Sequence, residues 1–407
     1  MSGEKDQQRI SKNAALYFYT IAFYYISLGA FSMLQGIYIK ELNLGESFLG
    51  LILSSRILAT AAFSIPAAVI VNRWGKKKAI LLGVFLVPVT SMLQGYFENS
   101  WLMIIFAVIQ GCAMAFLMVA EGPFFMENGT PNNRLKLFSY SFADNVFATM
   151  IGYFIFGHVS EKLNIVMGSI VSLKYSIVFS AVMGLIACIF AAMIKDNKIT
   201  TQKAESNFYK NAVSIIKEKG PLKFVIYNFI IGFGAGLVVP YFNVYLKYKV
   251  NASTDQIGII MSLAQAAMGI GGLITPIMAQ KYGKVKTIIV CQIVSVPFLM
   301  LIAIPPSLIV VSLALFVRNA LMNMSGPIVN NMAMELVQEH QRSAFASINN
   351  ISSNLSRALS AVIAGFIMKY FTNGYEIPYF ITAVMYVAAT LYFYKSFKTF
   401  ETKAKQL

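Results

Sequence analysis

The chain has 407 residues, of which 57% are hydrophobic and only 12% are charged. A water-soluble globular protein carries about twice that charged fraction, so the composition excludes a soluble globule and indicates a protein that lies mostly in lipid. The net charge of +16 would favour nucleic-acid binding in a soluble protein, but here it is explained by basic residues that flank membrane spans, and no nucleic-acid partner is expected.

Twelve apolar segments are long enough to cross a bilayer, which takes about 20 helical residues. They are continuously apolar and lack the two-residue alternation of barrel strands, so we expect helices. The spans are expected at residues 14–39, 47–71, 79–97, 101–126, 137–160, 173–194, 222–246, 255–279, 287–304, 307–333, 343–369 and 376–396. The sequence therefore predicts an all-α membrane protein with twelve transmembrane helices.

A short basic segment occurs twice, which divides the chain into two similar halves. Arg73-Trp74-Gly75-Lys76 returns as Lys281-Tyr282-Gly283-Lys284, 208 residues later. We expect an N-terminal six-helix half (1–194), a polar cytoplasmic linker (195–220) and a C-terminal six-helix half (221–407). Pseudo-symmetric halves of this kind pack around a central site in secondary transporters.

The basic residues also predict the orientation in the membrane. With an inside amino terminus, 24 of the 33 lysines and arginines lie on the inner segments, six lie on the outer segments and three lie within spans. This bias predicts a multi-pass protein of the cell membrane with both termini in the cytoplasm.

The loop after the second span resembles that of the major facilitator superfamily, whose pattern is Gly-x-x-x-Asp-Arg/Lys-x-Gly-Arg/Lys-Arg/Lys. Here the stretch runs from Ala68 to Lys77 and keeps the second glycine and the basic residues, but Asn72 and Gln280 stand in the two Asp places. The resemblance covers essentially the whole chain and implies transport by alternating access. It implies a conformational latch at Asn72, Arg73, Gly75, Lys76, Lys77, Gln280, Lys281, Gly283 and Lys284. The alternative is that the basic residues serve only the inside charge bias.

Five ionisable residues lie deep in the expected spans, where an unpaired charge is costly. Glu121 and Asp144 are the candidates for proton coupling, because a carboxyl group away from water can load and release a proton as access switches. Arg56, Arg318 and Arg357 are the candidates for holding an anionic part of a solute, since a guanidinium suits a carboxylate or phosphate. The alternative for each is an ion pair between helices.

Other polar and aromatic side chains are candidates for lining a cavity. They are Tyr24, Tyr25 and Gln35 in the first span, Tyr241, Asn243 and Tyr245 in the seventh, and Asn350 on the polar face of the eleventh. The seventh span also carries Gly232, Gly234 and Gly236 before Pro240, which predicts either a bendable wall or close helix packing.

The expected spans contain three deep arginines and two deep acids. This excess of positive charge favours proton symport of a small organic solute that carries an anionic group. The alternative is multidrug/proton antiport, although drug antiporters of this family often have a Gly-Pro motif in span five, which is lacking from Asp144 to Gly152. A less favoured alternative is a non-transporting receptor or scaffold on the same fold. No nucleophile–base pair or metal-ligand spacing suggests an enzyme or a cofactor. The expected partners are the solute, a proton or other coupling ion and lipids, with the protein as a monomer.

Overall fold

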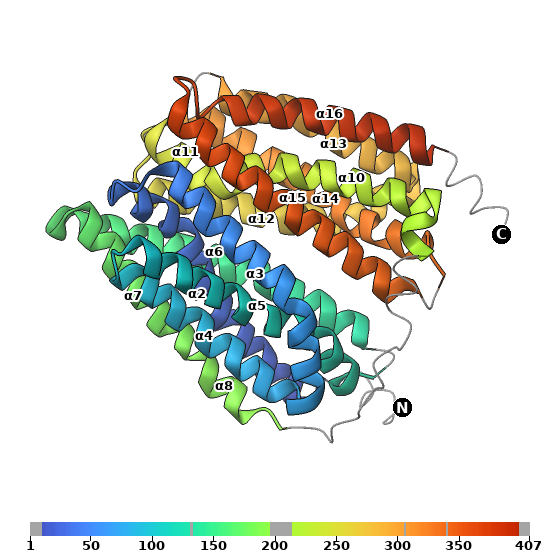
Figure 1. Cartoon of the computed structure of the whole chain (residues 1–407), viewed down its shortest axis with the longest axis horizontal. Helices are drawn as coiled ribbons and strands as arrows, with labels where there is room; N and C mark the ends of the chain where they lie inside the picture. Colours follow the sequence, from blue (N-terminus) through green and yellow to red (C-terminus); the bar gives the residue numbers. More distant parts are fainter. Residues whose placement is uncertain (1–9, 131–132, 196–213, 305–306, 339–340, 399–407) are drawn as a thin grey trace. The chain divides into compact units, whose positions relative to one another are not determined.

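The computed structural model describes residues 10–130, 133–195, 214–304, 307–338 and 341–398. Within these ranges the chain is helical and contains no strand (Figure 1). The predicted all-α fold is therefore confirmed.

The helices follow the predicted spans, with ends that mostly differ by a few residues. In the first half they are α2 (Lys12–Glu41), α3 (Gly45–Trp74), α4 (Lys76–Tyr96), α5 (Ser100–Asn128), α6 (Arg134–Met167), α7 (Ser169–Leu185) and α8 (Ala187–Met193). In the second half they are α10 (Lys219–Val238), η1 (Val239–Tyr241), α11 (Phe242–Tyr248), α12 (Thr254–Tyr282), α13 (Lys284–Ala303), α14 (Leu308–Glu335), α15 (Arg342–Tyr370) and α16 (Ile377–Phe397). Ten of the described spans are long and apolar enough to cross a membrane, and α6 and α12 occupy the two remaining predicted positions.

Two of the predicted spans are interrupted. The sixth consists of α7 and α8, and the seventh consists of α10 and α11 joined by the single 3-10 turn η1. Pro240 lies in η1, where it lacks an amide hydrogen and so cannot continue the helical hydrogen-bond ladder. The weak point predicted in the seventh span lies at this turn.

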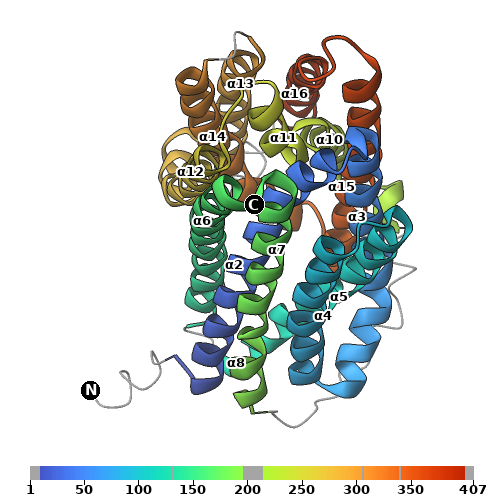
Figure 2. The ribbon, with the colours of Figure 1, turned by 90° about the vertical axis from the view of Figure 1, so that its left-hand side faces the viewer.

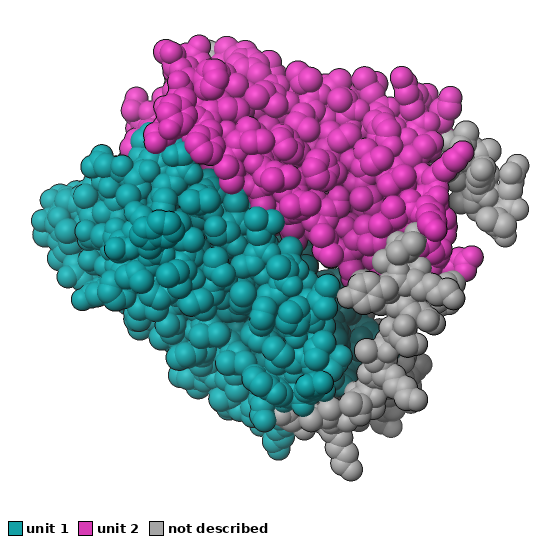
Figure 3. Space-filling model, viewed as in Figure 1, with its two compact units in different colours: residues 1–202, 253–262 teal, residues 203–252, 263–407 magenta. Residues whose placement is uncertain are grey.

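The chain forms two compact units (Figure 3). Unit 1 comprises Met1–Gln202 and Ser253–Ser262, and unit 2 comprises Lys203–Ala252 and Leu263–Leu407. The first turns of α12 belong to unit 1, because they pack on α6. There the Thr254 amide donates to a Glu161 carboxylate oxygen at 2.9 Å and the Ser262 hydroxyl donates to the Met150 carbonyl at 2.9 Å.

Within unit 1, α3 and α4 pack on α5, and α6 and α7 pack on α2 (Figures 1 and 2). Small residues allow a close crossing between α2 and α6. A Cβ atom at Gly152 would lie 2.2 Å from the Ile26 carbonyl oxygen, and one at Gly29 would lie 2.9 Å from the Thr149 carbonyl oxygen. Any larger residue would push these backbones apart.

Unit 2 repeats this crossing between α10 and α15. A Cβ atom at Gly236 would lie 2.1 Å from the Ser360 hydroxyl oxygen, and one at Gly232 would lie 2.3 Å from the Ser356 hydroxyl oxygen. These two glycines of the seventh span thus serve close packing, one of the two roles that the sequence allowed.

Gly75 and Gly283 join consecutive helices in the two units. Gly75 separates α3 from α4 with φ +91°, and Gly283 separates α12 from α13 with φ +87°. Glycine adopts this conformation without the strain that a side chain would cause, so the recurrence of glycine in the repeated segment has a backbone reason.

Candidate functional site

Unit 1 contains a pocket of about 230 Å³. Its lining comes from α2, α3 and α5 and consists of Tyr17, Ile21, Tyr24, Tyr25, Leu28, Thr60, Met114, Leu117, Met118 and Glu121. On α2 and α5 these residues recur every three or four positions, so each helix contributes one stripe. Glu121 is the only charged residue among these lining residues. The structure thus brings three predicted site residues together here: Tyr24, Tyr25 and Glu121.

The two predicted coupling acids have different surroundings. Glu121 accepts a hydrogen bond from the hydroxyl of Ser141 on α6. Asp144 lies one helical turn after Ser141, and its Oδ2 atom is buried without a hydrogen-bond partner. The neighbouring Asn145 is hydrogen-bonded to Tyr25, which lines the pocket. Ser141 and Asn145, which lie on either side of Asp144 in α6, therefore both contact residues that line the pocket.

Arg56 lies in a network of neutral amides. Its Nη1 atom donates to Gln35 Oε1 at 3.1 Å and to Gln110 Oε1 at 3.3 Å. Gln35 in turn donates to Gln94 Oε1 at 2.9 Å, and Gln110 donates to the Ser91 hydroxyl at 2.7 Å. Arginine can only donate hydrogen bonds, so both amide oxygens point toward Arg56. The network joins four helices, α2, α3, α4 and α5. Arg56 and Gln35 are thus placed together, but neither is among the pocket-lining residues.

The predicted tyrosines of unit 2 are packed inside it. Tyr241 and Tyr245 are both fully buried. The Tyr241 hydroxyl donates to the Ala361 carbonyl at 2.6 Å, and the Tyr245 hydroxyl donates to the Ile302 carbonyl. Asn243 is also buried, whereas Asn350 is exposed on α15. None of these four residues is among those that line the unit 1 pocket.

The two predicted arginines of unit 2 also differ. Arg318 is 3% exposed and donates to Asn319 Oδ1 at 2.9 Å and to the Tyr386 hydroxyl at 3.0 Å. Arg357 on α15 is exposed. Within the described part of unit 2, neither guanidinium has an ion pair with a carboxylate.

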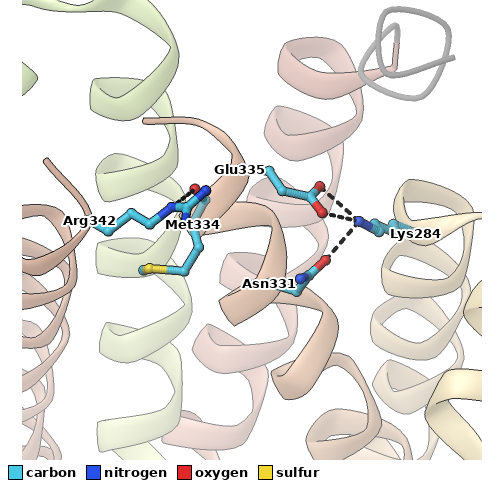
Figure 4. Close-up of polar contacts among 5 residues, drawn as sticks. All are labelled: Lys284, Asn331, Met334, Glu335 and Arg342. Carbon is cyan, nitrogen blue, oxygen red and sulfur yellow. Dashed lines mark hydrogen bonds and ion pairs between the residues drawn. The ribbon is translucent and has the colours of Figure 1, made fainter. Parts of the chain in front are cut away.

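The repeated basic segment forms an ion pair in each unit. Lys76 pairs with Glu127 in unit 1, and Lys284 pairs with Glu335 at 2.6 Å in unit 2. Lys284 also donates to Asn331 at 2.7 Å (Figure 4). The other predicted latch residues lie beside these pairs: Asn72, Arg73, Gln280 and Lys281 are exposed and Lys77 is partly exposed.

Beside each ion pair, an arginine donates a hydrogen bond to the backbone carbonyl of the residue that precedes the glutamate. Arg134 donates to the Met126 carbonyl at 2.9 Å, and Arg342 donates to the Met334 carbonyl at 3.1 Å (Figure 4). The partners Glu127 and Glu335 were not predicted from the sequence. The repeat in the sequence could have indicated them. Met126-Glu127 and Met334-Glu335 are 208 residues apart, the same separation as that between Lys76 and Lys284.

Comparison with known families shows one match along the chain. The family described as Major Facilitator Superfamily matches residues 17–222 and 224–406. Quinolone resistance protein NorA of Staphylococcus aureus (strain MRSA252) is 23% identical over 365 residues, which cover 88% of this chain and 90% of that protein. Multidrug resistance protein 2 of Bacillus subtilis (strain 168) is 21% identical over 278 residues, 66% of this chain and 67% of that protein.

Solved structures share the fold at low identity. The nucleoside transporter NupG superposes with a TM-score of 0.78 at 15% identity, covering 95% of this chain and 99% of NupG. The xylose transporter XylE from E. coli superposes with a TM-score of 0.70 at 16% identity, covering 95% of this chain and 98% of XylE. These likenesses concern the fold alone.

Proposed function

Because the chain belongs to the major facilitator superfamily, whose members are membrane transporters and not enzymes, we propose that it exports amphipathic cations from the cell in exchange for protons. The proposal includes an orientation with both termini in the cytoplasm, as the charge bias predicts.

The observation that carries the proposal is the lining of the unit 1 pocket. Among its described lining residues the one charged side chain is a carboxyl group, Glu121, and three tyrosine rings surround the same space. Carboxylates and aromatic faces both attract cations. Met114 and Met118 add flexible, polarizable surface that can adapt to ligands of different shape. The names of the curated relatives, a quinolone resistance protein and a multidrug resistance protein, agree with such a solute class.

Exchange for protons requires a group that holds either the solute or a proton. Glu121 is suited to this role because a protonated carboxyl group no longer attracts a cation, so the two ligands compete for one site. The Ser141 hydroxyl bonds to Glu121, and Asp144 lies one turn further along α6. We assign Asp144 to proton transfer between Glu121 and the aqueous phase.

Proton symport of an anionic solute, which the sequence favoured, is the second candidate. Arg357 supports it, because this residue is exposed on α15 and its guanidinium has no ion pair within the described residues of unit 2. Against it, none of the three arginines is among the residues that line the pocket.

The two candidates are distinguished by transport in proteoliposomes. With an acidic interior, cation–proton antiport should accumulate ethidium inside, and a protonophore should abolish the accumulation. With an alkaline interior, anion symport should instead accumulate a radiolabelled aromatic carboxylate such as benzoate above its level in protein-free liposomes, which the neutral acid enters by diffusion. Ethidium transport that is lost in Glu121→Gln and kept in Glu98→Gln would support the first candidate. Benzoate transport without ethidium transport would overturn it.

A further inference from the structure

Unit 2 holds a buried positive charge that no described carboxylate balances. Arg318 lies on α14 with 3% of its surface exposed. Its guanidinium carbon lies 5.3 Å from the centre of the Phe242 ring and 6.0 Å from that of the Tyr386 ring. Both side-chain hydrogen bonds of its terminal nitrogens go to neutral oxygens, of Asn319 and Tyr386. The cluster therefore solvates the guanidinium partly but leaves its charge uncompensated.

Two polar atoms of this cluster have no hydrogen-bond partner. They are the Nε atom of Arg318 and the hydroxyl oxygen of Tyr379, and both are buried. The Tyr379 ring lies 6.2 Å from the Phe242 ring, which also covers Arg318, and the Arg318 charge acts on the Tyr379 hydroxyl. A buried polar group without a partner costs about 1–3 kcal/mol. Arg318 Nε and the Tyr379 hydroxyl are thus two buried donors without an acceptor, and both side chains lie near the Phe242 ring.

Other charges near the cluster increase the need for a negative partner. Arg357 is close enough to Arg318 for the two guanidinium groups to repel each other. The described carboxylates of unit 2 lie elsewhere: Glu335 pairs with Lys284, Glu376 pairs with Lys249, and Glu218 accepts from Gln341. A water molecule could satisfy the hydrogen bonds but not the charge, and an uncompensated buried charge is expensive.

We propose that unit 2 binds a small monovalent inorganic anion of the halide class between Arg318 Nε and the Tyr379 hydroxyl. The site suits a small ion and not an organic solute, because Arg318 and Tyr379 are almost fully covered by their neighbours. Each donor would offer the ion one hydrogen bond, and the planar guanidinium supplies the positive charge. The inference is independent of the proposed cation export, which uses residues of unit 1.

Thermal unfolding of the purified protein tests the site. Chloride or bromide replaces gluconate at constant ionic strength, so that general screening is unchanged. We expect a saturable rise in Tm of roughly 2–4 °C at saturating halide. Equal Tm values in chloride and gluconate would overturn the proposal. A rise in Tm with benzoate but none with halide would also overturn the proposal, and would instead indicate that Arg318 binds the organic solute.

Two tyrosine variants provide the matched comparison. Tyr379→Phe keeps the ring and removes the proposed donor, so the halide concentration at half-maximal stabilisation should rise about tenfold. Tyr245→Phe makes the same change in the same aromatic cluster, but its hydroxyl already donates to the Ile302 carbonyl, so its halide midpoint should stay unchanged. An unchanged midpoint in Tyr379→Phe contradicts the site. Ethidium binding should persist in Tyr379→Phe, which separates this test from that of the proposed function.

Discussion

We expect Glu121 to determine the charge preference of the unit 1 pocket, because it is the one charged residue among the described residues that line it. In Glu121→Gln we expect the Kd for ethidium to rise about tenfold, since a contact to a charged group contributes about 1.5–3 kcal/mol. Equilibrium binding to the purified variant measures this. The control is Glu98→Gln, whose side chain is 55% exposed and pairs with Lys174. Equal affinity of both variants for ethidium would remove Glu121 from the solute site.

The ion pair of Lys284 with Glu335 is expected to act on switching and not on stability. The two side chains are 33% and 39% exposed, and pairs of this kind contribute about 0–1 kcal/mol. Glu335→Gln should therefore leave Tm nearly unchanged and leave ethidium affinity unchanged, while transport falls severalfold. The charge-swapped variant Lys284→Glu with Glu335→Lys should recover transport. Full transport in Glu335→Gln would show that the pair has no part in switching.

At the scale of the element, each unit contains a close helix crossing that requires glycine. The sequence alone left two roles for the glycines of the seventh span, and the structure places Gly232 and Gly236 against the serines of α15. In Gly236→Ala the new methyl group would overlap the Ser360 hydroxyl and the Arg357 carbonyl. We expect a loss of about 1–3 kcal/mol in the free energy of unfolding, as for other overpacked sites.

Gly326→Ala on α14 is the matched control for this prediction, because nothing lies within 4 Å of the added Cβ atom. There the same substitution should be neutral or should stabilise the helix by up to about 1 kcal/mol. Denaturation in detergent measures both variants. If Gly236→Ala is as stable as Gly326→Ala, the α10–α15 crossing is looser than described.

At the scale of the whole molecule, the orientation in the membrane is a prediction from charge. In a variant without Cys112, Cys188 and Cys291, a cysteine at Lys281 should react with an impermeant thiol reagent only from the cytoplasmic side. A cysteine at Asn164, in the last turn of α6, should react from outside. The reason is the 24 to 6 distribution of basic residues. Labelling of position 281 in intact cells would show that the orientation is opposite to the predicted one.

The sequence by itself determined the class of protein, the twelve helices and the repeat. These features follow from local properties, since a run of about 20 apolar residues must form a helix in lipid whatever its neighbours are. The glycines at 75 and 283 were likewise visible, because a backbone with positive φ constrains the residue type directly.

Only the tertiary structure decided what the polar side chains contact. Arg56, Arg318 and Arg357 look alike in the sequence, yet one lies among glutamines, one is buried by aromatic rings and one is exposed. Tyr24 lines a pocket, whereas Tyr241 bonds to a backbone carbonyl. The partner of a side chain in a neighbouring helix depends on how the helices are rotated and packed, and apolar runs that are hydrophobic on all sides carry little information about that rotation.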